Sequence, residues 1–282
     1  MKLVCKTPFK EKFMTIQSLL KPIEVHKSMT RILKNFRGVD ANPLRVIPIF
    51  EGSTQIGVIQ EIAKNIFAIS FRGSFGFMEV AACLNMTKVN CEKAKLNGKM
   101  HAGTYTTFLG IRKAVLQAID QMVPKELDER QITVIVEGHS RGAMIAIAIA
   151  AYISQKKIFK LILYTYSAMG ILDQEAANDF RGKVPNHLDF VAEGDFVPNI
   201  ANRFNFQRVG TKISFTPTNC NFFNFYVRQR KFPYFMLQNV YINSFINKFI
   251  ISSESWTAHM PDTYLEGAPV EVQKLVLKGY SN

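Results

Sequence analysis

Hydrophobic positions along the chain follow two periods, one typical of strands and one typical of helices. Runs rich in β-branched and aromatic residues predict strands over residues 46–50, 56–60, 66–71, 132–136, 159–166 and 188–192. Apolar residues at helical spacing predict a helix over residues 105–122, an alanine-rich stretch predicts one over 143–152, and a polar stretch predicts one over 173–180. This alternation predicts an α/β fold with a mostly parallel central sheet and helices on both faces.

The chain shows no internal division into separate domains. No repeat, low-complexity tract or linker rich in Pro, Gly or Ser interrupts it, and 48% hydrophobic residues among 282 can fill a sizeable core. General disorder is therefore excluded. We expect an irregular basic N-terminal arm over residues 1–45, followed by a single domain over residues 46–282.

The segment "TVIVEGHSRGAMIAIAIAA", residues 133–151, carries the clearest chemical signal. A β-branched run precedes Ser140 and a helix-forming run follows Gly142, so the serine lies at a sharp strand-to-helix turn. Such a turn exposes a nucleophilic hydroxyl and offers the next backbone N–H to an oxyanion. Gly138 and Gly142 would let the strand and the helix approach closely. The spacing alone also occurs by chance, so the flanking elements carry the prediction.

The cysteines and the hydrophobic segments indicate the cellular compartment of the protein. The four cysteines have no metal-ligand spacing and are too few for a disulfide framework, which fits a reducing compartment. The N-terminus has scattered lysines and no apolar core of a cleavable signal peptide. The apolar stretch over residues 143–153 is shorter than the roughly 20 residues that span a bilayer. We expect a soluble protein, cytoplasmic or exported without a signal peptide, and peripheral at membranes.

The formal net charge of +13 is unevenly distributed. The first 37 residues hold nine Lys and Arg against two Glu, and no acidic residue lies between Asp195 and Glu254. Basic zones attract phosphate in nucleic acid or in anionic lipid. Because no nucleic-acid-binding motif accompanies them, we expect an anionic membrane surface as partner and no nucleic acid. No feature predicts an oligomeric state.

A serine needs a base and an orienting acid to act as a nucleophile. In α/β-hydrolases the acid and then the histidine follow the serine along the chain. Only His187 and His259 follow Ser140, and His187 directly precedes a strand, at the sheet edge opposite the expected site. We therefore predict His259 as the base.

Several carboxylates could serve as the acid. The segment "LDFVAEGDFVP" places Glu193 and Asp195 just after a predicted strand, and Asp189 inside or before it. Asp262 lies only three residues from His259 and remains a further alternative.

Six segments, in order over residues 46–265, make the chain resemble the class 3 lipases, a fungal-lipase-like branch of the α/β-hydrolase fold. "FAISFRGS" is similar to the family's strand ending in F-R-G-T/S, "HAGTYTTF" to its H-x-G-F segment, and "VEGHSRGA" to its G-H-S-L-G turn. "FVAEGDFVP", "FQRVGTKISF" and "AHMPDTYL" are similar to the family's acid loop, its following strand and its histidine segment.

The resemblance implies roles for individual residues. It makes Ser140 the nucleophile, Asp195 the acid and His259 the base, with oxyanion donors at Ser74 and Arg141. It also places residues 75–84, "FGFMEVAACL", where the family has a lid, although the residues by themselves suggest an ordinary buried turn and helix. The reaction needs no cofactor and no metal.

The chain departs from the family pattern at two places. Arg141 replaces a leucine, and "YTYSAMG" replaces T-F-G-S-P-R-V-G without its glycine and proline. The Arg141 guanidinium could meet an anionic headgroup or pair with an acid such as Glu79.

The sequence thus predicts a serine lipase or phospholipase that hydrolyses glycerolipid esters. Ten phenylalanines lie between residues 197 and 253, and the segment over residues 219–250 combines aromatic with basic residues, which is typical of membrane docking. The alternatives are a non-catalytic hydrolase-like membrane-binding module and a soluble carboxylesterase. Among glycerolipids, triacylglycerol is the alternative to phospholipid.

Overall fold

A seven-stranded sheet forms the centre of the protein. The computed structural model describes residues 27–32, 45–74, 77–216 and 259 of the chain. The strands lie in the order β1-β2-β3-β6-β7-β8-β9; the first three pair antiparallel and the rest pair parallel, starting from β3. The mostly parallel sheet predicted from the sequence is therefore confirmed. The strands are β1 (Val46–Glu51), β2 (Thr54–Ala63), β3 (Ile66–Phe71), β6 (Thr133–His139), β7 (Lys160–Tyr166), β8 (His187–Ala192) and β9 (Thr211–Phe215).

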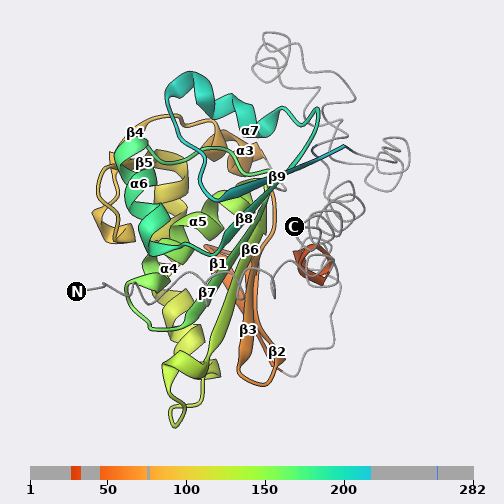
Figure 1. Ribbon diagram of the computed structural model, residues 1–282, viewed down its shortest axis with the longest axis vertical. Coiled ribbons are helices and arrows are strands. Elements are labelled where there is room, and N and C mark those ends of the chain that lie inside the picture. Colours follow the sequence, from red (N-terminus) through yellow and green to blue (C-terminus); the bar gives the residue numbers. More distant parts are fainter. Residues whose placement is uncertain (1–26, 33–44, 75–76, 217–258, 260–282) are drawn as a thin grey trace, which may run out of the picture.

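Helices α4 (Ala102–Met122), α5 (Arg141–Ser154) and α6 (Gln174–Lys183) cover one face of this sheet (Figure 1). The remaining elements are short. They are the helices α3 (Phe77–Cys83) and α7 (Val197–Ile200), the 3-10 turns Glu92–Ala94, Glu129–Gln131 and Ala201–Phe204, and a small hairpin of β4 (Lys88–Asn90) and β5 (Lys99–His101). In the described part of the chain, no helix is both long and apolar enough to cross a membrane.

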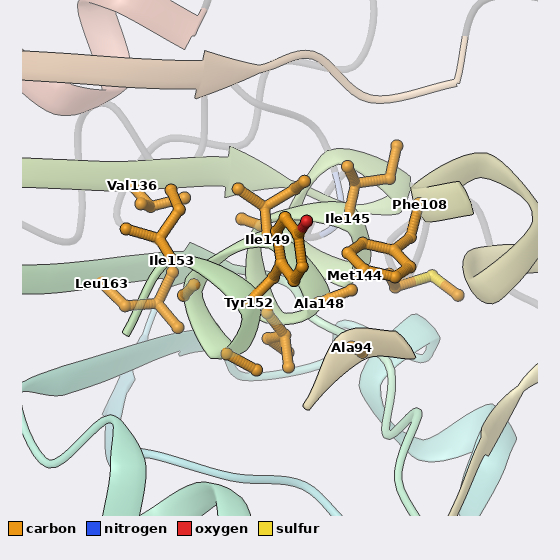
Figure 2. Close-up of a cluster of buried hydrophobic side chains, with 14 of the residues drawn as sticks. Ala94, Phe108, Val136, Met144, Ile145, Ala148, Ile149, Tyr152, Ile153 and Leu163 are labelled. Carbon is orange, nitrogen blue, oxygen red and sulfur yellow. The ribbon is translucent and has the colours of Figure 1, made fainter. Parts of the chain in front are cut away.

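Helix α5 is the centre of the hydrophobic core. All but one of its residues are buried, so the helix is apolar on every side, as expected for one enclosed between a sheet and other helices. Figure 2 shows Ile149 and Ile153 beside Val136 of β6 and Leu163 of β7, with Tyr152 near Phe108 of α4. Because both β6 and β7 are covered here, the sequence shows continuous apolar runs in them rather than alternation.

The opposite face of the sheet is covered in part by a helical segment, residues 27–32. Met29 and Ile32 are buried against this face. Arg31 forms a two-pronged ion pair with Glu137 of β6, at 2.7 and 2.6 Å, and Ser70 donates a 2.5 Å hydrogen bond to the same fully buried carboxylate. Part of the stretch expected to be an irregular arm is thus a packed helix. Its polar residues gave no sign of this, because the contacts that fix it are distant in sequence.

Two glycines allow β6 and α5 to meet. A Cβ on Gly138 would lie 2.6 Å from the backbone nitrogen of Ala143, and a Cβ on Gly142 would lie 2.5 Å from the carbonyl oxygen of Arg72. These distances are far inside van der Waals contact with backbone atoms that cannot move independently. The close approach predicted for these two glycines is present in the structure.

The same substitution should therefore have opposite effects at two helical glycines. Gly142→Ala should lower the free energy of unfolding by about 2 to 3 kcal/mol, because its Cβ overlaps the end of β3. Gly110→Ala, at an exposed position of α4 with nothing within 4 Å of the added Cβ, should raise it by roughly 0.5 to 1 kcal/mol. Urea denaturation measures both. Equal effects of the two substitutions would contradict the packing described here.

Candidate active site

The carboxyl ends of three neighbouring parallel strands bring the polar residues of the site together. Ser140 follows β6, Ser167 follows β7, and Asp195 lies in the loop after β8. Backbone hydrogen bonds extend the sheet to this edge, since the Ser140 N–H donates to the Tyr166 carbonyl and the Ser167 N–H to the Phe190 carbonyl, at 2.9 and 3.0 Å. Open parallel sheets generally place their sites at this edge.

Ser140 lies in the strained turn that its flanking sequence predicted. Its φ of 54° is unusual for a residue other than glycine, and it immediately precedes the first residue of α5. The glycine contacts described above hold this backbone conformation in place. The side chain is therefore directed out of the sheet and remains partly exposed.

Ser140, His259 and Asp195 form a hydrogen-bonded series. The Ser140 hydroxyl lies 3.0 Å from Nε2 of His259, and Nδ1 of the same ring lies 3.1 and 3.3 Å from the two carboxylate oxygens of Asp195. Asp195 and His259 are buried, at 3% and 7% exposure. The Val197 N–H also donates to Asp195, at 3.0 Å. These three residues, chosen from the sequence, have the geometry of a nucleophile, a base and an orienting acid.

His139 holds the backbone at His259. Its Nε2–H donates to the carbonyl oxygen of His259 at 2.9 Å, and the two rings lie 5.1 Å apart between centroids. Burial, followed by the nearby His259, lowers the pKa of His139 to about 3. The ring is therefore neutral at physiological pH, so it fixes the neighbouring histidine without adding a second positive charge.

The two predicted oxyanion positions lie on either side of the serine turn. Arg141 is the first residue of α5, where backbone N–H groups lack partners inside the helix. Ser74 lies three residues after the end of β3, and a Cβ on the preceding Gly73 would lie 3.6 Å from the Ser140 Cβ. The Ser74 hydroxyl lies 3.7 Å from the thiol of Cys83 in α3.

The Arg141 guanidinium points away from solvent and pairs with acids. The residue is 5% exposed, forms an ion pair with Glu51 at the end of β1, and contacts the Thr107 hydroxyl at 3.0 Å. A second carboxylate, Glu79 of α3, lies 3.6 Å from it. Of the two roles considered for this side chain, the structure supports pairing with acids.

Helix α3 is attached to the rest of the site by charged and polar contacts. Glu79 forms two hydrogen bonds with Arg72, at 2.9 and 2.8 Å. His101 accepts from the Thr104 N–H at the start of α4 and donates from Nε2 to the Cys83 carbonyl, each at 3.1 Å. Burial lowers the pKa of His101 to about 4, in keeping with this neutral capping role. The predicted lid segment is thus a short helix here, although residues 75–76 lie outside the described chain.

The alternative bases and acids lie elsewhere. His187 begins β8 and hydrogen bonds to Thr165 at 2.8 Å, and Asp189 pairs with Arg208 inside the fold. Glu193 accepts from Thr216 at 2.7 Å at the exposed edge. None of these three contacts Ser140 or His259. Asp262 and the predicted membrane segment, residues 219–250, lie outside the described residues.

Two features of the site were not predicted from the sequence. Ser167 lies within 2.6 Å of Nδ1 of His259, and Glu51 is the main partner of Arg141. Ser167 follows a predicted parallel strand, so the strand-end rule that selected Ser140 could have selected it as well. Glu51 gave no comparable signal, because its strand is antiparallel and distant in sequence.

This arrangement can activate a serine hydroxyl for attack on a carbonyl carbon. His259 can accept the hydroxyl proton, Asp195 can orient the ring, and backbone N–H groups beside Ser140 can hold a developing oxyanion. Within the described ranges, no cluster of three or more His, Cys, Asp or Glu residues could hold a metal ion.

Comparison with known proteins finds similarity to the same family that the sequence motifs indicated. The family model described as "Lipase (class 3)" matches residues 68–205. The fold is similar to a triacylglycerol lipase from Penicillium expansum, with a TM-score of 0.58 and 18% identity over 70% of this chain and 80% of that one. It is also similar to the triacylglyceride lipase of Rhizomucor miehei, with a TM-score of 0.55 and 20% identity over 76% and 82% of the two chains. No curated protein matches the sequence.

The buried histidines should make the fold sensitive to acid. Burial lowers the pKa of His187 to about 3, so between about pH 6.5 and 3 the unfolded chain binds a proton that the folded chain does not. Stability from this group is therefore lost as the pH falls through that window. Asp189 acts in the opposite direction, because burial raises its pKa to about 6.

His187→Gln, whose amide can still donate to Thr165, isolates the histidine's contribution. Between pH 7.5 and 4.5 the wild-type free energy of unfolding should decrease by roughly 2 kcal/mol more than that of the variant. Urea denaturation at the two pH values measures this difference. An identical pH dependence in both proteins would mean that His187 does not remain neutral in the folded state.

Proposed function

Because this chain belongs to the class 3 lipase family through residues 68–205, we propose that it is a serine lipase acting through Ser140, His259 and Asp195. The observation that carries the proposal is the hydrogen-bonded series at the strand ends, with Ser140 3.0 Å from Nε2 of His259 and Asp195 3.1 Å from Nδ1. These three residues are far apart in sequence, yet the serine contacts the histidine and the histidine contacts the aspartate, as acyl transfer by a serine nucleophile requires.

The proposed reaction proceeds through an acyl-enzyme. His259 takes the proton of the Ser140 hydroxyl as its oxygen attacks the ester carbonyl carbon. The backbone N–H groups at Ser74 and Arg141 receive the oxyanion, and the imidazolium then gives its proton to the leaving alcohol. Water, deprotonated by the same histidine, attacks the acyl carbonyl, and the imidazolium then returns this proton to the Ser140 oxygen as the acid is released. Asp195 keeps Nδ1 protonated throughout, so that Nε2 is free to accept.

Burial around the base supports this assignment. Asp195 is enclosed, and the ring of Phe196 lies 6.1 Å from that of His259. In such a site the carboxylate interacts with the imidazolium more strongly than it would in water. The neutral His139 contributes no competing charge.

For the substrate we propose a membrane glycerolipid, with a phospholipid favoured over triacylglycerol. The support comes from the sequence. The segment over residues 219–250 combines phenylalanines with basic residues such as Arg228, Arg230 and Lys231, and it precedes His259 in the chain. Apolar insertion together with attraction to anionic lipid, at about 1 kcal/mol per basic residue near the surface, would bring an ester bond to Ser140. Docking of this kind also implies a peripheral location at membranes.

Removal of the nucleophile tests the mechanism. Ser140→Ala should lower kcat for ester hydrolysis by roughly 10⁴- to 10⁶-fold, and His259→Ala should lower it to a similar extent. Combining the two should add almost nothing, because the residues act as a unit. His187→Gln is the matched control and should keep near-normal activity. Retention of more than a tenth of wild-type activity by Ser140→Ala would refute the assignment of the nucleophile. Absence of ester hydrolysis by the wild-type protein would instead leave a non-catalytic binding module.

The substrate proposal is tested with three esters at two salt concentrations. Hydrolysis of anionic phospholipid vesicles should exceed that of neutral vesicles and of a soluble short-chain ester, and it should weaken as salt screens the charges. A triacylglycerol emulsion provides the comparison within glycerolipids. Equal rates on vesicles and short-chain ester, without salt dependence, would contradict membrane docking and support a soluble carboxylesterase.

A further inference from the structure

A second serine lies inside the proposed catalytic series. Ser167 is fully buried after β7, and its hydroxyl oxygen lies 2.6 Å from Nδ1 of His259. The same oxygen is within hydrogen-bond distance of Oδ2 of Asp195. The direct distances from Nδ1 to the Asp195 carboxylate, 3.1 and 3.3 Å, are longer than the one to the serine.

The direction of each hydrogen bond follows from the chemistry of the groups. A carboxylate only accepts, so the Ser167 hydroxyl proton is directed to Asp195. Nε2 of His259 must accept from Ser140, so the ring proton is on Nδ1 and is donated to the Ser167 oxygen and to the carboxylate. Hydrogen bonds thus connect His259, Ser167 and Asp195 in a ring, in which Ser167 accepts from the base and donates to the acid.

The backbone at Ser167 indicates that this hydroxyl is held in a specific place. Its φ is 55°, a value that favours glycine, so a residue with a side chain occupies a backbone conformation in which glycine would be more stable. Its N–H donates to the Phe190 carbonyl at 3.0 Å, which fixes the residue to β8.

We propose that Ser167 is a positioning residue that shares the Nδ1 proton of His259 with Asp195 and so holds the base in the orientation that accepts from Ser140. This inference rests on the proposed function. By donating to the Asp195 carboxylate, Ser167 also offsets part of its negative charge, which weakens the stabilisation of the imidazolium. The titratable groups that face His259 in the described chain are Asp195 and the neutral His139, so the shared carboxylate is the charge that this hydroxyl affects.

Two variants remove the hydroxyl in different ways. Ser167→Gly suits the positive φ and therefore folds even if the alanine form does not, whereas Ser167→Ala retains the Cβ. Both should lower kcat by roughly 5- to 50-fold with little change in KM, because the base loses the hydrogen bond that holds its ring in the orientation that accepts from Ser140. The midpoint of the acidic limb of the kcat/KM pH profile should rise by about half a unit or more.

Ser70→Ala is the matched control. Ser70 is also buried and also donates to a carboxylate, Glu137, at 2.5 Å, but on the opposite face of the sheet. Its substitution should lower the midpoint of urea denaturation and leave the midpoint of the pH profile unchanged. A purely structural role for Ser167 would give the same result as this control.

A double-mutant cycle with Asp195→Asn separates a shared proton from independent effects. When the carboxylate becomes an amide, its NH2 group can donate to Nδ1 and favour the wrong tautomer, so the Ser167 oxygen becomes the acceptor that keeps the proton on Nδ1. Ser167→Ala should therefore cost at least ten times more activity in the Asp195→Asn background than in the wild-type background. Additive losses, or an unchanged kcat and pH profile in both Ser167 variants, would overturn the proposal. Absence of ester hydrolysis by the wild-type protein would refute the proposed function instead, so the two failures are distinguishable.

Discussion

The close contact of Gly138, Gly142 and the end of β3 is the constraint on which the site depends. It brings the first turn of α5 against two parallel strands and holds Ser140 at a positive φ of 54°. Because the glycines two positions before and after the strained residue lie against neighbouring backbone, the strain is supported by the burial of α5 and not by local hydrogen bonds alone. The same contact places the Arg141 N–H beside the serine and aligns Gly73 and Ser74 with it.

Charged groups surround this turn in two separate sets. On one side Arg72, Glu79, Arg141 and Glu51 are linked by ion pairs and fix α3 to the start of α5. On the other side Asp195 and His259 meet Ser140, with the neutral His139 behind the base. The guanidinium of Arg141 is thus balanced by carboxylates of its own, and the Asp195 charge is left to act on His259. Buried pairs of this kind are costly unless the charged groups have partners, and in both sets each carboxylate accepts at least two hydrogen bonds.

The sequence predicted the elements that depend on local pattern. Most of the parallel strands, α5 and the positions of Ser140 and His259 followed from apolar runs, turn residues and order along the chain. Asp195 was chosen among several carboxylates because of the resemblance to the class 3 lipases. The helix at residues 27–32 and the partner of Arg141 did not, because Arg31 meets Glu137 and Arg141 meets Glu51 over 106 and 90 residues. Ser167 could be predicted only in part. The sequence places it at the end of a strand, but its short distance to His259 depends on a positive φ that serine rarely adopts.

Labelling with a fluorophosphonate, which reacts with serines activated by a neighbouring base, tests the central claim most directly. Mass spectrometry of the digested protein should find one adduct, on Ser140, and His259→Ala should abolish it while leaving the protein folded. An adduct on another serine, or equal labelling of Ser140 in the wild type and in His259→Ala, would contradict the account, because the hydroxyl would then not depend on the base 3.0 Å away.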